Sequence, residues 1–236
     1  MRQARKKRAR PTGPARSGRP KPPTERHPQQ RSLETRERLV EAALEVFASH
    51  GFEGATTREI AARAGVALAA LPYHFTTKEA LWRAAADRIF GRLAEAFRAR
   101  VAGLDGVEAH TRLRLLLGDF VRFQAAHPAL HRLMIQEGLA RTPRLEWLVE
   151  AHIRPIYNFV RGLVEEAQAG GMTPAGRPEQ LHYVLIGAAS TAYALAAEYE
   201  LLTGERPDRE AAVAEHIAML ERLLLIPEAG PARRSR

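Results

Sequence analysis

The sequence predicts an all-α protein, and three observations support that prediction. Apolar residues recur at helical spacing from Ser32 to about residue 225. Glycine and proline interrupt this stretch at intervals that suit ordinary helices. No stretch shows the alternation of a convincing pair of strands. We therefore expect about nine helices, arranged as an N-terminal three-helix domain and a larger helical domain behind it.

Bulk composition narrows the class of protein further. A chain of 236 residues can bury a real core. Cysteine is absent, which excludes disulfides and thiolate chemistry and fits a reducing, cytoplasmic compartment. The sequence contains no run of about eighteen apolar residues, so we expect no membrane-spanning helix. The basic N-terminus continues into proline and glycine rather than an apolar segment, so we expect no secretory signal.

The net charge of +9 is concentrated at the N-terminus. Residues 1–31 hold eleven Lys or Arg and one acid, whereas the other 205 residues hold 25 basic and 26 acidic side chains. Six prolines and few apolar side chains predict that residues 1–31 are a disordered arm that attracts phosphate. A merely solubilising extension is the alternative. A second disordered tail is expected at residues 227–236.

The first helix and the start of the second can be placed from their side chains. One face of the first helix gathers four apolar residues, and Gly51 follows as a C-terminal stop. These residues are Leu39, Ala43, Val46 and Phe47. The second helix opens with a capping box, Thr56-x-x-Glu59, and we expect Ile60, Ala61 and Ala64 to face inward.

A tight turn at Gly65 joins the second helix to a short third segment, Ala67–Tyr73. Phe75 should return to the core, and Thr77-Lys78-Glu79 then opens a long fourth helix. Two helices joined by such a turn, with the second short and exposed, form a helix-turn-helix. In this motif the second helix enters the major groove of DNA.

Five helical segments follow the fourth helix. Proline and glycine delimit them at residues 106–126, 128–140, 143–169, 178–202 and 208–225. Pro155 lies inside the third of these segments and should kink it. The predicted domains are thus a helix-turn-helix domain at 32–80 and a regulatory and dimerisation domain at 81–226.

The stretch from Thr35 to Leu81 resembles the DNA-binding domain of the TetR/AcrR family of bacterial repressors. Three patterns carry the resemblance, in the right order: TR-x-x-[IL]-x-x-AA-x-x-x-F-x-x-x-G (35–51), TT-x-x-IA-x-x-AGV (56–66) and YHF-x-x-KE-x-L (73–81). The resemblance implies a three-helix reader followed by a helical domain for ligand binding and dimerisation. It also implies a bacterial protein that lies on the nucleoid when bound to DNA.

The resemblance implies DNA contacts at nine positions. They are Thr56, Thr57, Arg58, Ala67, Leu68, Ala70, Tyr73, His74 and Lys78. The threonines can meet a phosphate at the helix start, and Lys78 is similar to a lysine that clamps the DNA backbone. Two of these residues also have an alternative role in the fold. Thr56 can act only as a helix cap, and Tyr73 can lie partly in the core.

The reading segment departs from the family pattern. Family members commonly carry Ser or Thr at the position of Ala67, a polar residue at Leu68 and often Tyr at Pro72. The segment therefore offers no Arg, Asn or Gln for bidentate base recognition. We expect apolar contacts to thymine methyl groups through Leu68, support from Arg58, and a dependence on DNA shape.

Large side chains and interleaved polar groups recur beyond residue 106, as in pockets for small molecules. The candidate effector residues are Phe120, Phe123, His127, Met134, Glu137, Trp147, His152, Tyr157 and Tyr183. The same pattern describes an ordinary helical core, and the sequence leaves both interpretations open. The effector itself is expected to be apolar or amphipathic.

No metal, cofactor or catalytic site is expected. His127 and His131 have a metal-binding spacing, but Pro128 separates them and no third ligand is evident. Metalloprotease, phosphate-loop and nucleophile-elbow motifs are absent from the sequence. An enzyme is accordingly the weakest of three functional hypotheses.

A homodimer is expected through residues 178–225. The stretch 183–197 is apolar almost all round and rich in small residues, so it must be buried, either against a second copy or inside one chain. Together these observations predict a ligand-responsive dimeric repressor that binds an inverted repeat. The alternative is a nucleic-acid binder without sequence preference, driven by the basic arm.

Overall fold

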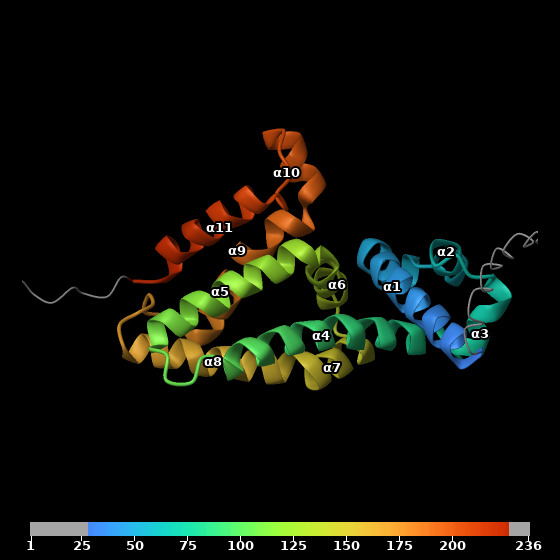
Figure 1. Ribbon diagram of the computed structural model, residues 1–236, viewed down its shortest axis with the longest axis horizontal. Coiled ribbons are helices and arrows are strands. Elements are labelled where there is room, and N and C mark those ends of the chain that lie inside the picture. Colours follow the sequence, from blue (N-terminus) through green and yellow to red (C-terminus); the bar gives the residue numbers. More distant parts are fainter. Residues whose placement is uncertain (1–27, 227–236) are drawn as a thin grey trace, which may run out of the picture.

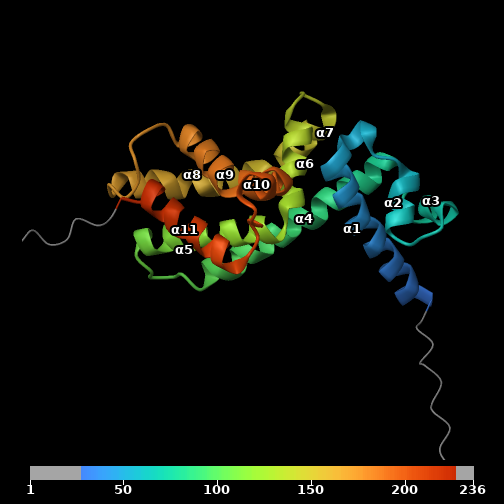
Figure 2. The ribbon, with the colours of Figure 1, turned by 90° about the horizontal axis from the view of Figure 1, so that it is seen from above.

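The computed structural model describes residues 28–226, so the first 27 residues of the arm predicted at 1–31, and the tail predicted at 227–236, lie outside the described residues. The described chain is helical throughout and contains no strand. A small head of α1–α3 lies at one end of an elongated molecule, and α4 runs from it along the domain that α5–α11 form (Figure 1). Viewed from above, α6 and α7 lie next to the head (Figure 2).

The head and the connecting helix follow the predicted order. Their elements are α1 (Pro28–Gly54), α2 (Thr57–Arg63), the 3₁₀ turn η1 (Leu68–Ala70), α3 (Leu71–His74) and α4 (Lys78–Ala102). α1 begins four residues before the expected boundary at Ser32, so 28–31 belong to the helix. Gly51 has φ 68° inside α1, which is where the sequence predicts the helix to end.

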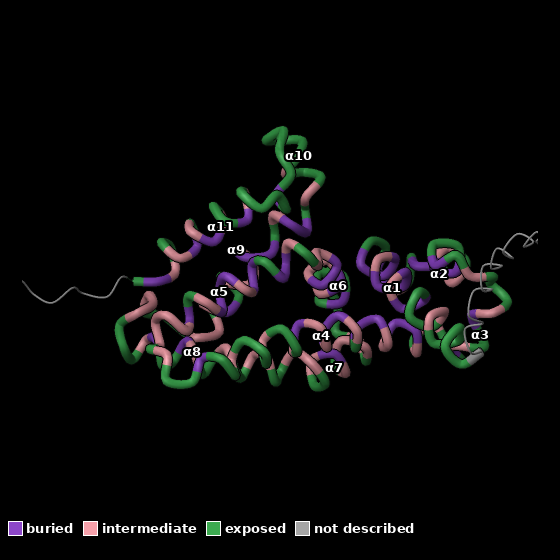
Figure 3. The backbone as a smooth tube through the Cα atoms, viewed as in Figure 1, coloured by how far each residue is buried: buried purple, intermediate pink, exposed green. Residues whose placement is uncertain are grey.

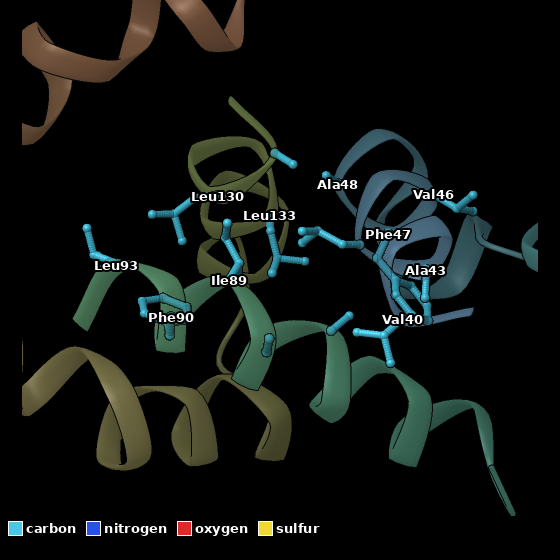
Figure 4. Close-up of a cluster of buried hydrophobic side chains, with 14 of the residues drawn as sticks. Val40, Ala43, Val46, Phe47, Ala48, Ile89, Phe90, Leu93, Leu130 and Leu133 are labelled. Atoms are coloured by element: carbon cyan, nitrogen blue, oxygen red, sulfur yellow. The ribbon is translucent and has the colours of Figure 1, made fainter. Parts of the chain in front are cut away.

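The core of the head is built from the face predicted for the first helix. Leu39, Ala43, Val46 and Phe47 are all buried, and Phe75 joins them from the end of the reading segment. Phe47 lies in one cluster with Ile89 of α4 and Leu133 of α6 (Figure 4). The head is therefore packed directly onto α4 and α6 rather than joined to them by a linker.

The second domain contains the five predicted helical segments, two of them interrupted. Its elements are α5 (Ala109–Ala126), α6 (Pro128–Gly138), α7 (Pro143–Leu148), the π-helical turn η2 (Val149–Ile153), α8 (Arg154–Ala169), α9 (Pro178–Ala194), α10 (Ala196–Thr203) and α11 (Glu210–Leu224). The predicted segment 143–169 is divided by η2, and the segment 178–202 is divided at Leu195. These two interruptions account for the difference from the nine helices expected.

The disturbance expected at Pro155 is present as the π-helical turn ahead of it. The N–H of Arg154 bonds to the carbonyl of Val149, five residues back. Pro155 has no N–H to give and its ring crowds the preceding turn, so the backbone widens by one residue there. α8 then continues regularly from its first turn, where proline is tolerated.

The apolar stretch 183–197 is only partly covered in the single chain. Ala189, Tyr193 and Ala194 are buried, whereas Tyr183 is 74 % exposed and Val184 also faces outward. The tube in Figure 3, coloured by residue burial, shows exposed residues along α10 and in parts of α11. No helix in residues 28–226 is long and apolar enough to cross a membrane.

Candidate nucleic-acid interface and effector cavity

The turn between α2 and the reading segment is a complete Schellman motif. The N–H of Val66 bonds to the carbonyl of Ala61 (2.9 Å), and that of Gly65 to the carbonyl of Ala62 (3.1 Å). Gly65 has φ 63°, a left-handed conformation that costs other residues about 1–2 kcal/mol. This glycine therefore fixes the angle at which the reading segment leaves α2.

The start of α2 presents predicted contact residues to solvent. The hydroxyl of Thr56 accepts the N–H of Glu59 at 3.1 Å, which is the capping bond that the sequence predicts. The second half of the predicted capping box is not formed, because the Glu59 carboxylate lies 3.4 Å from Nδ1 of His50 on α1 instead of accepting the N–H of Thr56. Thr56 and Arg58 are exposed and Thr57 is half-buried, so all three lie at the surface where a phosphate could approach.

The reading segment is shorter and more irregular than a regular recognition helix. One 3₁₀ turn and one α-helical turn replace it, and Pro72 sits in the first turn of α3. Leu68 is 43 % exposed and Tyr73 is 89 % exposed, so the alternative that Tyr73 belongs to the core is wrong. Ala67 is also exposed, whereas Ala70 is half-buried because Leu71 beside it packs into the core.

The last two predicted DNA contacts lie where the reading segment meets α4. His74 is half-buried, and its ring packs edge-on against Tyr73. Lys78 opens α4, but its Nζ lies 3.4 Å from the carbonyl of Glu53 and 4.6 Å from the centre of the Phe52 ring. To clamp a phosphate, this lysine must leave the end of α1.

Two arginines on α1 hold the reading unit in place, and the sequence analysis did not single them out. Arg38 donates to the carbonyls of Ala64 (3.2 Å) and Gly65 (3.5 Å) at the end of α2. Arg36 lies 5.0 Å from the centre of the Phe75 ring. Every helix ends with backbone carbonyls that lack a partner inside the helix, so a cationic donor can be expected near the end of α2. The sequence does not show which Lys or Arg donates to them.

Three of the predicted effector residues lie at the junction between α4, α6 and α7. Glu137 is 4 % exposed, and Nε of Arg144 lies 3.3 Å from its carboxylate. Burial raises the pKa of Glu137, and Arg144 partly offsets that rise. Trp147 packs edge-on against Trp82, and Nε2 of His152 lies 2.9 Å from Asp87 of α4.

The other predicted effector residues are scattered as well. Phe123 packs against His127 at the α5–α6 corner, with ring centres 4.6 Å apart, while Met134 packs against the main core. Tyr183 faces solvent, and Tyr157 packs edge-on against His182. Of the nine, Phe120 alone lines the cavity described next. The structure therefore does not bring the predicted set around one ligand.

A small, partly open cavity of about 60 Å³ lies between α4, α5, α8 and α9. Twelve of its thirteen lining residues are apolar, and the thirteenth is His182. The apolar lining is Leu93, Phe97, Leu113, Leu116, Leu117, Phe120, Ile156, Val160, Leu163, Val164, Leu185 and Ile186. His182 is 8 % exposed, and its Nδ1 is buried without a hydrogen-bond partner. Burial lowers the pKa of His182, so the imidazole is neutral at pH 7.

An open groove of about 500 Å³ borders this cavity on the α4–α8 side. Leu93, Phe97 and Ile156 line both spaces, so these three side chains form the wall between them. Arg98 is the one charged residue among those that line the groove. Phe159 of α8 and the C-terminal end of α4 complete the lining. In residues 28–226 no group of three or more potential metal ligands gathers.

Comparison with known proteins relates this geometry to regulators of transcription. Residues 39–85 match the model of the bacterial regulatory proteins of the tetR family. The HTH-type transcriptional regulator RutR of Escherichia coli K12 is 27 % identical over 191 residues, covering 79 % of this chain and 87 % of its own. The repressor AcnR of Corynebacterium diphtheriae is 32 % identical over 120 residues, covering 48 % and 55 %.

Solved structures agree with the arrangement of helices. The SCO4942 protein of Streptomyces coelicolor superposes with a TM-score of 0.58 at 25 % identity, covering 80 % of this chain and 98 % of its own. A TetR transcriptional regulator from Chloroflexus aurantiacus gives a TM-score of 0.58 at 23 % identity, covering 84 % and 100 %. The second similarity extends over both the head and the helical domain behind it, and it concerns the fold alone.

Proposed function

Because this chain is a TetR-family transcriptional regulator with an N-terminal helix-turn-helix domain, we propose that it is a repressor that binds an inverted-repeat operator as a homodimer and is released by a small molecule. One observation supports this most strongly. α4 carries the fully buried Trp82 at the head and, about three turns further along, Leu93 in the cavity wall. A change at the cavity can therefore reach the head through one rigid element.

The DNA-reading part of the proposal depends on an apolar reading surface. Leu68 and Ala67 project from the 3₁₀ turn, and neither can donate or accept a hydrogen bond through its side chain. Contact with thymine methyl groups and a response to DNA shape are the forms of readout left to them. Arg58, exposed at the start of α2, adds a cation that can reach a base edge or a phosphate.

The dimer part rests on the apolar faces of α9 and α11. Tyr183, Val184 and Leu223 are exposed in the single chain, and Glu179 is the one charged residue of α9. A second copy related by a two-fold axis would cover these faces with the same faces of its own. Two linked heads would then read two half-sites, which matches an inverted repeat.

The release step follows from the size of the cavity. A space of about 60 Å³ is far smaller than the roughly 300 Å³ or more that drug-sized ligands occupy. Such a ligand must therefore displace side chains of the wall that α4 and α8 share, and any shift of α4 that follows moves the head with it. Ligand and DNA would then favour different positions of α4, so that each weakens the binding of the other by linkage.

The proposal is tested by selecting genomic DNA fragments at physiological salt. The full chain is compared with a shortened chain that begins at Pro28, where α1 starts, and with Leu68→Ala and Arg58→Ala variants. We expect the full and shortened chains to enrich the same short inverted repeat. Leu68→Ala should weaken its preference for the base at one position of each half-site, whereas Arg58→Ala should weaken binding overall.

A second function is distinguished by the same selection. A binder driven by the basic arm would retain almost nothing once the first 27 residues are removed, because those residues hold ten of the eleven basic side chains of the predicted arm. Fragments enriched without any shared motif, and only by the full chain, would support that alternative and contradict the repressor. The proposed role places the protein in the cytoplasm, on the nucleoid when bound to DNA.

A further inference from the structure

Starting from the proposed function, we infer that the effector is an uncharged aliphatic molecule with a single oxygen function, which enters from the groove between α4 and α8 and hydrogen bonds to His182. This inference concerns the chemical class of the ligand, which the fold alone does not determine. Three features of the described residues support it: the composition of the cavity wall, the unpaired nitrogen of His182, and the thin partition between cavity and groove.

The cavity wall excludes charge. None of its thirteen residues is ionised at neutral pH, because twelve are apolar and burial keeps His182 neutral. An ionised carboxylate or ammonium brought into this space would lose its water and find no opposite charge. The ligand portion that enters must therefore be uncharged, and the Leu, Ile and Val lining fits saturated carbon chains.

His182 is the one residue of the lining whose side chain can form a hydrogen bond. Its Nδ1 is covered and has no hydrogen-bond partner, a costly state that a ligand would relieve once wall side chains move aside and uncover it. Tyr157 packs edge-on against the imidazole, with ring centres 5.1 Å apart, and limits its rotation. A neutral imidazole both donates and accepts, so a hydroxyl or a carbonyl oxygen can satisfy it.

The groove supplies the entry path and the extra room. Only Leu93, Phe97 and Ile156 separate it from the cavity, and Phe97 and Ile156 are half-buried side chains that can change rotamer. When they turn aside, the groove and the cavity become one apolar channel. A flexible alkyl chain suits such a channel because it can pass between side chains that have changed rotamer.

The test measures binding in the absence of DNA, with the full chain. N-phenyl-1-naphthylamine, an uncharged probe that fluoresces in apolar sites, is bound first and then displaced by 1-decanol or by decanoate at pH 7.5. We expect 1-decanol to displace the probe at concentrations at least tenfold lower than decanoate. This comparison uses the unaltered protein and depends on no variant.

The role of His182 is tested by substitution. His182→Phe keeps a flat ring but removes the hydrogen bond. It should lower the affinity for 1-decanol about tenfold, while the affinity for the probe changes less than twofold. His182→Gln keeps a hydrogen-bonding group and should retain most of the affinity. The control is His131→Phe on α6, because His131 is a half-buried histidine that lines neither space. Thermal unfolding verifies that each variant is folded.

The outcomes separate this inference from the proposed function. Equal displacement by decanoate and 1-decanol, no binding of the probe, or an unchanged affinity in a folded His182→Phe variant would each overturn the inference. If 1-decanol binds as expected but leaves the affinity for the selected DNA unchanged, the assignment of the ligand class stands and the release mechanism fails.

Discussion

Leu39, Phe47 and Ile60 in the head are completely buried, whereas the aliphatic side chains of the second domain border an empty cavity and an open groove. Apolar side chains thus have different roles in the two domains. In the head they fill all the space and hold a short reading segment at a set angle. In the second domain they leave room that a ligand can occupy, at the cost of lost dispersion contacts.

Unpaired polar atoms are distributed in the same way. In the part of the chain that the structure describes, buried side-chain nitrogens or oxygens without a partner occur at Trp82 and otherwise beyond residue 105, His182 among them. Such atoms lower stability locally. The difference teaches that the packing of the head favours one fixed conformation, whereas the second domain has space and unpaired polar atoms that a ligand can fill and satisfy.

The largest expected effect comes from removing a filled position in the head. Phe47→Ala should lower the free energy of unfolding by about 3–5 kcal/mol, because the surroundings of Phe47 cannot collapse into the hole. Urea denaturation followed by circular dichroism measures this change. A loss below about 1 kcal/mol would mean that the head is as adaptable as the cavity.

The second largest effect comes from larger side chains, which should cost more stability in the head than beside the cavity. Ala43→Leu in the fully packed head should cost about 1–3 kcal/mol through overpacking. Ile186→Phe adds volume beside the cavity, which can take it up, and should change stability by less than about 1 kcal/mol. Both variants are compared with the unaltered chain by the same denaturation. Equal costs at the two sites would contradict the contrast.

Backbone strain gives a smaller effect. Gly65→Ala should cost about 1–2 kcal/mol, because alanine disfavours the left-handed conformation at φ 63° although its methyl group meets only ordinary contacts. The matched control is Gly162→Ala in the middle of α8, where the added methyl group meets nothing within 4 Å. That change should stabilise the protein by roughly 0.5–1 kcal/mol. Melting temperatures that shift in the same direction for both variants would contradict the explanation by backbone strain at Gly65.

The smallest effect concerns pH and the buried Glu137. Burial raises its pKa in the folded state, so the folded protein holds this proton more tightly than the unfolded chain. Its contribution to stability is therefore present at low pH and is lost as the pH rises above the ordinary glutamate pKa of about 4.3. Glu137→Gln should gain stability relative to the unaltered chain between pH 4 and pH 7. A stability difference that does not depend on pH would refute the assignment.

The head could be predicted from sequence because its signals are local. A capping threonine, a glycine in the left-handed region and apolar residues at helical spacing each act within a few positions, and Thr56 and Gly65 lie where expected. The early start of α1 at Pro28 escaped because a proline is equally at home in a disordered arm and in a first helical turn.

The second domain was harder because its signals are tertiary. Glu137, Trp147 and His152 look like pocket residues in sequence, but contacts with Arg144, Trp82 and Asp87 use them at the junction with the head. The cavity is lined instead by ordinary leucines, isoleucines and valines. Only helix packing decides which of many similar side chains border a void.

The most direct test of the account measures the distance between the two heads. The chain has no cysteine, so a spin label at Ser49→Cys reports that distance from an exposed position on α1 that is not among the predicted DNA contacts. Double electron–electron resonance is recorded for the free protein, with the selected DNA, and with 1-decanol. The account predicts one short-range distribution on DNA and a clear shift away from it with 1-decanol. The same distribution in all three states, or no distance between protomers at all, would contradict it.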